Sequence, residues 1–548
     1  MVHAKRWLFL VHRWLGVLLC AFFAMWFISG VVMMYVGYPK LTSAERLAHL
    51  PALRATPVVL EPAQALAEAG LQGPLQDLRL AVASGAGRPV YLATPEHAAH
   101  AAGGKNGRMQ RPTATVIDAE TGAVLAGADA GHALASAAAF AGPGVAVAHE
   151  GTLDEDAFTH SRALDPHRPL HRVRLADEQG TVLYVSGKTG EVVRDTTRTE
   201  RVWNFAGAWI HWLYPFRGNV FNAYWTDIVN WLSILGIAVT VLGTVVGLMR
   251  WRFAGTYRNG THSPYPSGMM RWHHLAGLLF AVVTFTWIFS GLMSMNPWRI
   301  FDSAAAPLQV QAMQGGPLTL PGQPASVHAL LAAAPAEVRE LRWARTAGHS
   351  LVQAHAPGHR TVLLNAVTAM PHAWAEGELE ASAAALVSAP ILRIETLQRY
   401  DTYYYTREPH TMGGGTEKPL PVLRVVFDDP QASWVHIDPH TGMVLNRTDH
   451  LRRVHRWVFA MLHSWDWLPL LSLRPLWDII LIVLSLGGLA LSVTGIVIGW
   501  RRVVLKARRP RKNIRATPPT PQAMQGTQPL EGGTSTASIC SGSRNCSA

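Results

Sequence analysis

Long apolar runs at four places dominate the pattern of hydrophobic and polar residues along this chain. They cover residues 15–36, 228–248, 275–295 and 476–500, and only the last contains a charged residue, Asp478. A helix needs about 20 apolar residues to cross ~30 Å of hydrocarbon. The pattern therefore predicts four transmembrane helices. The first is expected to be an uncleaved anchor, because its apolar stretch is long and no small-residue cleavage site follows it.

The two long segments between these runs show strand-like alternation that ends in turns. The turns lie within residues 114–122, 183–190 and 434–442, with a degenerate fourth copy at 364–369. An Asp side chain caps such a turn and Gly supplies its positive φ, so each turn suits a hairpin. Helices are expected before the strands, at residues 62–69 and 381–387. Each segment is thus predicted to form two small α+β modules.

The apolar runs match one another in pairs. The first matches the third at a constant offset of 261, through His12 with His273, Gly16 with Gly277, Trp26 with Trp287 and Gly30 with Gly291. The second matches the fourth at an offset of 252, through Arg201 with Arg453, His211 with His463, Trp225 with Trp477, Gly243 with Gly495 and Gly247 with Gly499. Such a repeat predicts a pseudo-twofold axis along the membrane normal, with functional sites between the halves. Close helix packing is the alternative explanation for the matched glycines.

Composition and charge agree with a membrane protein. Of 548 residues, 49% are hydrophobic and only 15% are charged, which is few for a soluble protein of this size. The net charge is +12, and basic residues flank the spans at Lys5, Arg6 and Arg13, at Arg250, Arg252, Arg258 and Arg271, and over residues 501–512. By the positive-inside rule these flanks are cytoplasmic, which argues against nucleic-acid binding. Both termini are then expected in the cytoplasm.

The expected fold is an α-helical integral membrane protein of the bacterial inner membrane, with four transmembrane helices, a two-fold internal repeat and two periplasmic α+β domains. The expected parts are a cytoplasmic N-terminus with the first span (1–37), a periplasmic domain (38–200), an edge helix with the second span (201–250), a cytoplasmic loop (251–270), the third span (271–296), a second periplasmic domain (297–450), an edge helix with the fourth span (451–502) and a cytoplasmic tail (503–548). The tail is rich in Pro, Gln, Gly and Ser, which is typical of disorder. Cys20, Cys540 and Cys546 form no disulfide framework.

Four matched histidines lie at the ends of the expected spans, where an ionisable residue is costly unless it has a function. His12 and His273 begin outward-running helices and are expected near the cytoplasmic face. His211 and His463 precede inward-running helices and are expected near the periplasmic face. A twofold axis would place the members of each pair opposite each other. An interfacial histidine can also be merely solvated, and His274 is a rival of its neighbour His273.

Two facing neutral imidazoles in an apolar bundle are what a six-coordinate haem needs. The candidate walls are Trp14, Trp272, Phe280 and Trp287 on the cytoplasmic side, with Arg13 and Arg271 for the propionates, and Trp209, Trp212, Trp465 and Trp467 on the periplasmic side, with Arg201 and Arg453. Interfacial Trp is also common as a membrane anchor. Zinc suits these positions less well, because neither face offers a Cys or obvious further ligands. Two haems at opposite faces would carry electrons across the membrane.

At these residues the chain resembles the PepSY-associated transmembrane family, which includes iron-regulated and iron-uptake membrane proteins and inner-membrane ferric-siderophore reductases. The resemblance is carried by residues 12–16, 271–277, 287–291 with 296–298, 420–442, and 474–478 through 499–501. It implies PepSY-type folds for the two outer domains and two b-type haems held by His12, His211, His273 and His463. It also implies that the protein is an oxidoreductase that reduces iron in the periplasm.

The electron donor and the acceptor follow less directly. Some relatives carry a fused flavin module, but after Lys512 nothing foldable follows and no Gly-rich nucleotide fingerprint occurs. A separate cytoplasmic reductase or membrane quinol is therefore expected to supply the electrons. An aromatic cluster of Tyr403, Tyr404 and Tyr405, beside a Gly-rich loop that starts at His410, is a candidate site for a ferric siderophore or other ferric chelate. Packing inside the module is the alternative for these tyrosines.

Two other functions compete with a dihaem ferric-chelate reductase. The chain could be a membrane-anchored module that binds or restrains an envelope peptidase, or senses envelope ligands, without redox activity. The matched histidines argue against this, because anchors in membrane lipid need none. A transporter is suggested by the repeat, but the spans are expected to lack the broken helices and midplane charges of a transport site.

Overall fold

The computed structural model describes residues 2–55, 59–84, 87–96, 113–217, 220–408, 411–416 and 418–507. The chain divides into two units, Met1–Trp500 and Arg501–Ala548, and the architecture below is that of the first unit. Most of the tail predicted to be disordered, with Cys540 and Cys546, lies outside the described residues, as does His410.

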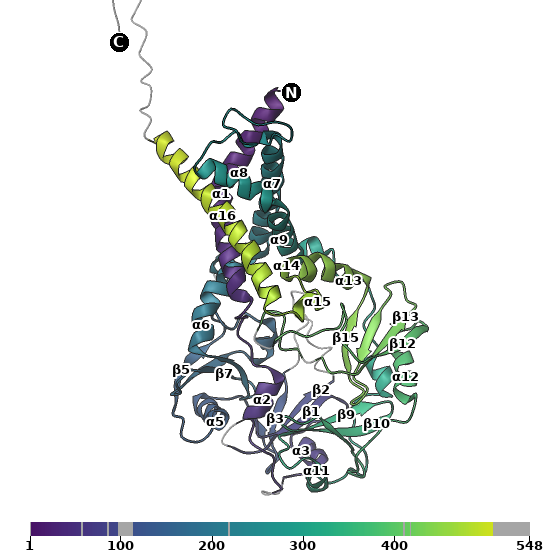
Figure 1. Ribbon diagram of the computed structural model, residues 1–548. Helices are drawn as coiled ribbons and strands as arrows, with labels where there is room; N and C mark the ends of the chain where they lie inside the picture. The colour runs from purple at the N-terminus through teal and green to yellow at the C-terminus, as the bar shows by residue number, and fades with distance from the viewer. Residues whose placement is uncertain are drawn as a thin grey trace, which may run out of the picture. The chain divides into compact units, whose positions relative to one another are not determined.

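Within the described residues, three helices are long and apolar enough to cross a membrane, namely α1 (Val2–Met33), α7 (Trp225–Arg250) and α16 (Leu476–Ala507) (Figure 1). A fourth span exists only if α8 (Met269–Leu279) and α9 (Ala281–Ser294) are taken together, and these two helices are bent by 66°. Four uninterrupted helices were predicted, so the third span differs from the prediction. The apolar pattern continues through the break at Phe280 and no Pro marks it.

The span helices pack through glycines that admit large side chains from their neighbours. A Cβ at Gly487 of α16 would lie 2.2 Å from the ring of Phe280, the residue at the break. A Cβ at Gly488 would lie equally close to the ring of Phe27 of α1. The apolar centre of the bundle consists of Leu19, Phe23, Phe27, Val239 and Ile288. Close packing at small residues therefore occurs at Gly487 and Gly488, which were not among the matched glycines, whereas a Cβ at the matched Gly16 would meet nothing within 4 Å.

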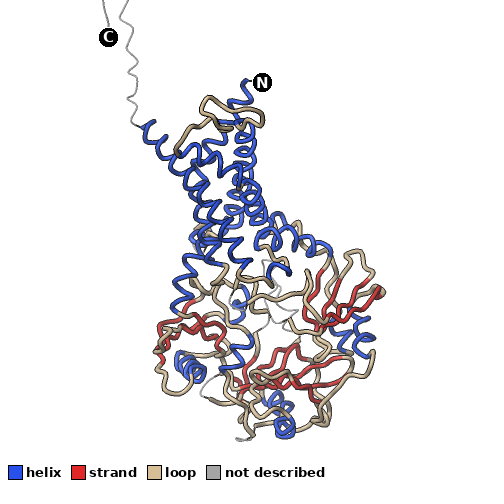
Figure 2. The backbone as a smooth tube through the Cα atoms, in the orientation of Figure 1, coloured by secondary structure: helices blue, strands red, loops and turns tan. Residues whose placement is uncertain are grey.

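The strands form three antiparallel sheets, which lie apart from the span helices (Figure 2). The largest has seven strands in the order β11 (Val362–Asn365), β10 (His349–His355), β9 (Glu340–Thr346), β1 (Leu75–Ala81), β2 (Val90–Pro95), β3 (Thr115–Asp118) and β4 (Val124–Leu125). The second contains β5 (Val147–Leu153), β6 (Leu170–Leu175), β7 (Val182–Ser186) and β8 (Val192–Thr196), and the third β12 (Ile391–Leu397), β13 (Val422–Phe427), β14 (Trp434–Ile437) and β15 (Val444–Thr448).

The seven-stranded sheet joins the two long segments of the chain. Strands β1 and β9 pair antiparallel, with Leu78 opposite Trp343 and Ala81 opposite Glu340. Each strand would otherwise be a free edge, and pairing satisfies its backbone groups. The first modules of the two segments are thus one sheet with one core, which sequence periodicity did not reveal.

Short helices accompany the sheets. They are α2 (Ser43–His49), α3 (Pro62–Glu68), α5 (Ala130–Ala141), η1 (Arg162–His167), α10 (Val310–Gln314), α11 (Val327–Ala333), α12 (Glu378–Ala383) and η6 (Ala384–Leu386), whereas η5 (Pro297–Arg299) follows α9. Helices α3 and α11 bury Leu66 and Leu330 in the core of the large sheet. Helix α5 packs Ala133 and Ala137 on β6 and β7, while α12 contributes Leu379 to the core of the third sheet. The predicted α+β character is therefore confirmed.

All four predicted turns form. Asp118 and Asp438 cap two of them as expected, by accepting a backbone N–H with a side-chain oxygen. Ser186 and Asn365 cap the other two in the same way, although an Asp was expected there. The residue that follows each cap by four has a positive φ, namely Gly122, Gly190, Ala369 and Gly442. Ala369 has a left-handed conformation, with φ of 55°, whereas the equivalent residue in the other three turns is Gly.

Candidate functional site

The structure brings the four predicted histidines together in two pairs. His12 of α1 faces His273 of α8, with ring centroids 6.4 Å apart and ring planes at 37°. His211 faces His463 with centroids 6.1 Å apart and planes at 76°. A metal about 2 Å from one imidazole nitrogen on each side would place the two centroids roughly 6 Å apart. We call His12 with His273 the distal pair, and His211 with His463, which follow the strands closely in sequence, the proximal pair.

In the distal pair, each imidazole donates from Nδ1 to a backbone carbonyl of a facing span. Nδ1 of His12 lies 3.2 Å from the carbonyl oxygen of Val239, and Nδ1 of His273 lies 3.2 Å from that of Leu491. A carbonyl only accepts, so Nδ1 carries the proton and the Nε2 lone pair is left available. His273 Nδ1 also lies 3.2 Å from Oγ1 of Thr494, whose own proton goes to carbonyls of α16.

Glycines one helical turn beyond these carbonyls give the imidazoles their room. A Cβ at Gly243, four residues after Val239, would lie 2.6 Å from Cε1 of His12. A Cβ at Gly495, four residues after Leu491, would lie 2.5 Å from Sγ of Cys20 and 3.3 Å from Cε1 of His273, so this glycine makes room for both side chains. Both glycines belong to the matched positions of the sequence. Each therefore seats a histidine, in addition to any role in helix packing.

In the proximal pair, a serine hydroxyl lies beside Nδ1 of each imidazole. Oγ of Ser29 lies 2.9 Å from Nδ1 of His211, and Oγ of Ser290 lies 3.0 Å from Nδ1 of His463. The single hydroxyl proton of each serine is already donated within its own helix, to the carbonyls of Met25 at 2.7 Å and Trp287 at 3.0 Å. Each serine must therefore accept from Nδ1, which again leaves the Nε2 lone pair available.

Burial keeps both proximal imidazoles neutral. It lowers the pKa of His211 to about 3, with the neighbouring His463 as the second cause. Burial is also the main cause that lowers the pKa of His463. A neutral imidazole is the form that binds a metal, so both side chains are in the ligating state at neutral pH.

The two segments that carry the proximal pair share the same irregular backbone. The first runs through α6 (Arg198–Asn204), a π-helical turn η2 (Phe205–Trp209), η3 (Tyr214–Phe216) and η4 (Asn222–Tyr224), and the second through α13 (His450–Arg456), a π-helical turn η7 (Trp457–Met461), α14 (Leu462–Ser464) and α15 (Leu468–Leu471). Two residues beyond each histidine the backbone is left-handed, with φ of 54° at Leu213 and 50° at Trp465. Single π-turns occur frequently at functional sites.

His274 does not join the distal pair. It is buried, and both of its ring nitrogens are engaged, Nδ1 with Oγ of Ser263 at 2.8 Å and Nε2 with the carbonyl oxygen of Gly247 at 2.9 Å. The geometry therefore favours His273 over His274 as the partner of His12.

The arginines expected to bind propionates have other partners in the structure. Arg201 donates to the carbonyls of Thr196 and Gly180, and Arg453 donates to that of Ala432, so both attach a helix to the neighbouring sheet. Arg271 donates to the carbonyl of Pro266, and Arg13 is half-buried. Their role toward a propionate stays a prediction.

The expected aromatic walls are partly buried and partly exposed. Trp287 packs against Phe27 with ring centroids 5.7 Å apart, and its Nε1 is buried without a hydrogen-bond partner. Trp212 packs against Tyr38 at 5.7 Å. Trp14 and Trp272 are exposed, which suits contact with lipid.

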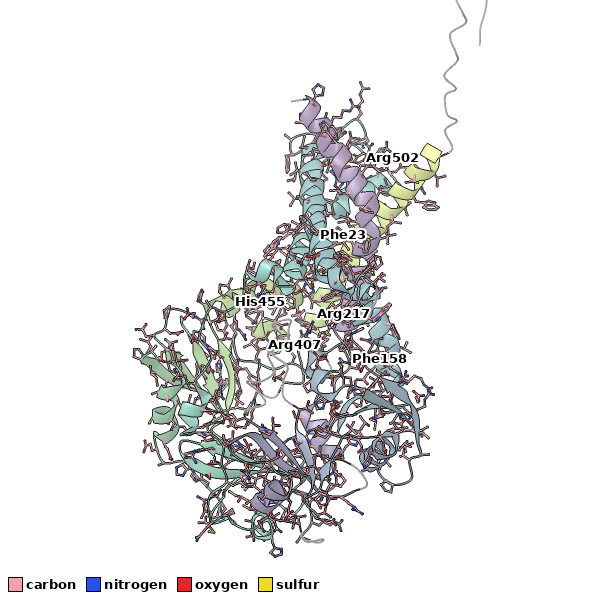
Figure 3. The ribbon with its side chains drawn as sticks, turned by 180° about the vertical axis from the view of Figure 1, so that it is seen from behind. Phe23, Phe158, Arg217, Arg407, His455 and Arg502 are labelled. Atoms are coloured by element: carbon pink, nitrogen blue, oxygen red, sulfur yellow. The ribbon has the colours of Figure 1, made fainter. Side chains whose placement is uncertain are left out.

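The three tyrosines of the candidate chelate site lie beside the helices that carry His463. Tyr404 is fully buried, with its ring stacked on His436 and its hydroxyl donating to Pro419, which is the packing alternative for this residue. Tyr403 accepts from Nε1 of Trp457 at 3.0 Å. Tyr405 and Arg407 both contact Asp466, and Figure 3 labels Arg407 where the helices meet the strands. Substrate binding by these tyrosines stays a prediction.

The residues of the two pairs fit a bis-imidazole haem. Each pair supplies two opposed neutral nitrogens, and no group of three His, Cys, Asp or Glu able to hold a bare ion occurs among the described parts of the chain. The other four positions of a haem iron are filled by its own macrocycle. Helix α1 gives the distance between the two pairs. It carries His12 of the distal pair, and it passes the proximal pair at Gly30, whose Cβ position lies 3.7 Å from Cε1 of His211. These two residues are 18 positions apart, or roughly 27 Å at 1.5 Å per residue. The pairs are therefore separated by about the thickness of a hydrocarbon core.

The fold and the two pairs define an α-helical integral membrane protein with two sites of paired, half-buried histidines. The chain belongs to the family described as PepSY-associated TM region, whose model matches residues 9–502. A search of curated proteins finds no match for it. The serines Ser29 and Ser290 were not among the predicted site residues. The sequence carried a signal for them, because each precedes a matched glycine in a recurring Trp-x-x-Ser-Gly stretch.

Proposed function

We propose that this protein is a dihaem transmembrane electron-transfer protein of the bacterial inner membrane that reduces ferric chelates, such as ferric siderophores, at the periplasmic face during iron uptake. The observation that supports it is the double pairing of histidines, with centroids 6.4 Å apart at one end of the bundle and 6.1 Å apart at the other. Helices that serve only as anchors have no use for four half-buried, oriented imidazoles.

The chain's own residues account for binding and position. The four histidines offer Nε2 as axial ligands, while Val239, Leu491, Ser29 and Ser290 hold the opposite ring nitrogens. Between the pairs, Leu19, Phe23 and Phe27 line the bundle centre and exclude water. A b-type haem bound at each pair would supply one-electron chemistry, and the protein would fix its orientation and potential.

The charges at the ends of the spans indicate the orientation of the protein in the membrane. Lys5, Arg6 and Arg13 accompany His12, and Arg271 precedes His273, so the positive-inside rule assigns the distal pair to the cytoplasmic face. Both termini are then cytoplasmic and both α+β segments periplasmic, with the internal repeat setting the halves around a pseudo-twofold axis. Electrons would enter from a cytoplasmic reductase or from membrane quinol and leave from the proximal pair.

The acceptor site we propose lies beside the proximal pair. Asp466, three residues after His463, accepts from Tyr405 at 2.7 Å, and the cations Lys418 and Arg456 lie 5.2 and 4.8 Å from the Tyr405 ring. Aromatic rings with cations suit a large anionic ferric chelate. One electron converts Fe(III) to Fe(II), which hard oxygen ligands bind less tightly, so release of the iron needs no further chemistry.

A second candidate function is a membrane-anchored module that binds or restrains an envelope peptidase, or senses envelope ligands. It is favoured by the amount of folded structure outside the spans, which comprises three sheets. In that case the histidine pairs would bind no cofactor.

The test is the dithionite-reduced minus oxidised spectrum of the detergent-purified protein, with a pyridine haemochrome count per chain. We expect two b-type haems, and Ala at His12 or His273 should remove one while Ala at His211 or His463 removes the other. His262→Ala and His455→Ala are matched controls, because each is a neighbouring histidine that belongs to neither pair.

Both controls should retain two haems. If the wild-type protein contains no haem after expression with ample haem supply, the reductase is rejected and the anchored module becomes the better proposal. If haem is present but no ferric chelate is reduced, the electron-transfer role stands and the acceptor is rejected.

A further inference from the structure

The backbone just after each proximal histidine is held by a tryptophan at the start of the next span. Nε1 of Trp225, the first residue of α7, donates to the backbone carbonyl of Trp212 at 2.8 Å. Nε1 of Trp477, the second residue of α16, donates to the backbone carbonyl of Ser464 at 3.1 Å. Each acceptor is the residue immediately after a histidine of the proximal pair. The same hydrogen bond therefore recurs in both halves of the chain.

These two carbonyls lie where a helical turn ends. The residues that follow them, Leu213 and Trp465, are left-handed, with φ of 54° and 50°. The helix cannot continue through such a residue, so it supplies no N–H to the carbonyl before it. The indole N–H takes the place of that donor and fixes the peptide plane next to the histidine. Because the rotamer of a side chain depends on its backbone, the indole also restrains the imidazole.

Each of the two tryptophans is itself held by arginine. Trp477 is 1% exposed, and the guanidinium carbons of Arg407 and Arg474 lie 5.3 and 5.2 Å from the centre of its ring. The guanidinium carbon of Arg217 lies 5.1 Å from the centre of the Trp225 ring. A guanidinium over an indole face is attracted to it. Both indoles are thus fixed in place, as a group that positions a ligand must be.

The two histidines differ in the number of indole N–H groups that hold their backbone. The carbonyl of His211 itself accepts from Nε1 of Trp26 at 3.0 Å. The residue matched to Trp26 is Trp287, and its Nε1 is buried without a hydrogen-bond partner in the part of the chain that the structure describes. An indole therefore holds two successive carbonyls at His211, whereas His463 has only the bond from Trp477.

We propose that Trp225 and Trp477 are positioning residues, which orient the two proximal imidazoles through the backbone and so set the angle of 76° between their ring planes. This inference rests on the proposed function. Partners that do not touch a metal still orient its ligands. The angle between two axial imidazole planes sets the splitting of the iron d orbitals, so the EPR spectrum of a ferric bis-imidazole haem reports it. The distal pair, at 37°, is the internal reference.

The test is the low-temperature EPR spectrum of the oxidised, haem-loaded full-length protein, with haem counted per chain. The proximal signal is the one that His211→Ala removes. Trp477→Phe keeps an aromatic ring but loses the N–H, so it should shift the proximal signal and weaken retention of this haem by up to about tenfold, the lower end of the effect of removing a partner of a metal ligand. Trp225→Phe should do less, because Trp26 still holds His211.

The double variant Trp26→Phe/Trp225→Phe should bring the effect to that of Trp477→Phe, and it carries the test if Trp477→Phe does not fold. Trp231→Phe is the matched control, because this indole is 61% exposed on α7 and holds no carbonyl among the described residues. It should leave both signals unchanged. An unchanged distal signal shows that a variant is folded.

The inference is overturned if the proximal signal and haem retention of Trp477→Phe equal those of the wild type, or if the distal signal changes as much as the proximal one. Amide hydrogen exchange of the peptide that contains His463 needs no haem, and Trp477→Phe should make it faster. Unchanged exchange would also overturn the inference. Absence of haem from the wild type would reject the proposed function, and the exchange rates would still show whether the indole holds this backbone.

Discussion

The hydroxyl of Tyr405 donates to Oδ2 of Asp466 at 2.7 Å, and this bond ties the α+β region to the segment that carries His463. Asp466 is 4% exposed, and Arg407 lies 3.3 Å from its other carboxylate oxygen. The backbone carbonyl of Asp466 accepts from Arg456. A displacement of Tyr405 would therefore be passed to Asp466, which follows His463 by three residues.

Removing this hydroxyl should lower stability. In Tyr405→Phe the buried Asp466 loses a charge-assisted hydrogen bond, which costs about 1–3 kcal/mol of unfolding free energy. The measurement is the midpoint of thermal unfolding in detergent. Tyr400→Phe is the matched control, because its hydroxyl donates to the carbonyl of Lys418 at an exposed position, and it should change the midpoint far less. Equal effects of the two changes would show that the Asp466 bond has no special weight.

A methyl group at Gly243 should disrupt the distal pair. The added Cβ would lie 2.6 Å from Cε1 of His12, so the imidazole must leave its place opposite His273. Overpacking of this kind costs about 1–3 kcal/mol, and under the proposed function one haem is lost. Gly16→Ala, on the α1 side of the same end of the bundle, meets nothing within 4 Å and is the control. Retention of both haems in Gly243→Ala would contradict the seating role of this glycine.

Ala369→Gly should stabilise the fourth turn. A left-handed conformation costs a non-Gly residue about 1–2 kcal/mol, whereas Gly adds about 0.4–1 kcal/mol of chain entropy to the unfolded state. The difference predicts a gain of roughly 0.5–1 kcal/mol from these two terms, measured as an increase in the thermal midpoint. The reverse change at the matching turn, Gly442→Ala, should destabilise, because its Cβ would lie 2.5 Å from Thr346. A lower midpoint for Ala369→Gly would refute the strain argument.

Asp195 should make stability depend on pH. Burial, followed by the charges of Glu200 and Glu45, raises the pKa of Asp195 from 3.8 to about 7. The folded state therefore binds a proton that the unfolded state releases, and stability should fall as the pH rises from about 4 to about 7, by up to about 1.36 kcal/mol per pH unit. Asp195→Asn should flatten this part of the profile and raise the midpoint at pH 8. The exposed Asp154→Asn is the control and should leave the profile as it is.

The site was easier to predict from the sequence than the fold around it. Constant offsets matched His12 with His273 and His211 with His463, and a symmetric pairing of helices needs no more than this to bring the rings together. The turns were predictable because capping and positive φ are local requirements, as Asp118 and Gly122 show. The features that were not predicted involve contacts between residues far apart in the sequence. The ring of Phe280, at the break, packs against Gly487 of another helix, and β1 pairs with β9 across more than 250 residues of sequence.

The second layer around the histidines lies between these extremes. Ser29 and Ser290 stand in a stretch whose recurrence was visible, but the sequence could not say which atom each hydroxyl contacts. The orientation of His274 is similar, because only the folded loop shows that Ser263 and Gly247 occupy both of its nitrogens. Repetition in a sequence thus identifies residues that matter, and three-dimensional packing assigns their partners.

The strand pairing that joins the two segments has a mechanical consequence. Transporters that alternate access rock one half of a repeat against the other around a central site. Here the strand pairing that runs from Leu78 opposite Trp343 to Ala81 opposite Glu340 links the two halves. A rocking motion of one half against the other would have to break the hydrogen bonds between these strands. A structure braced in this way resists a change in the separation of its two halves, and under the proposed function this would keep the paired histidines at a constant distance.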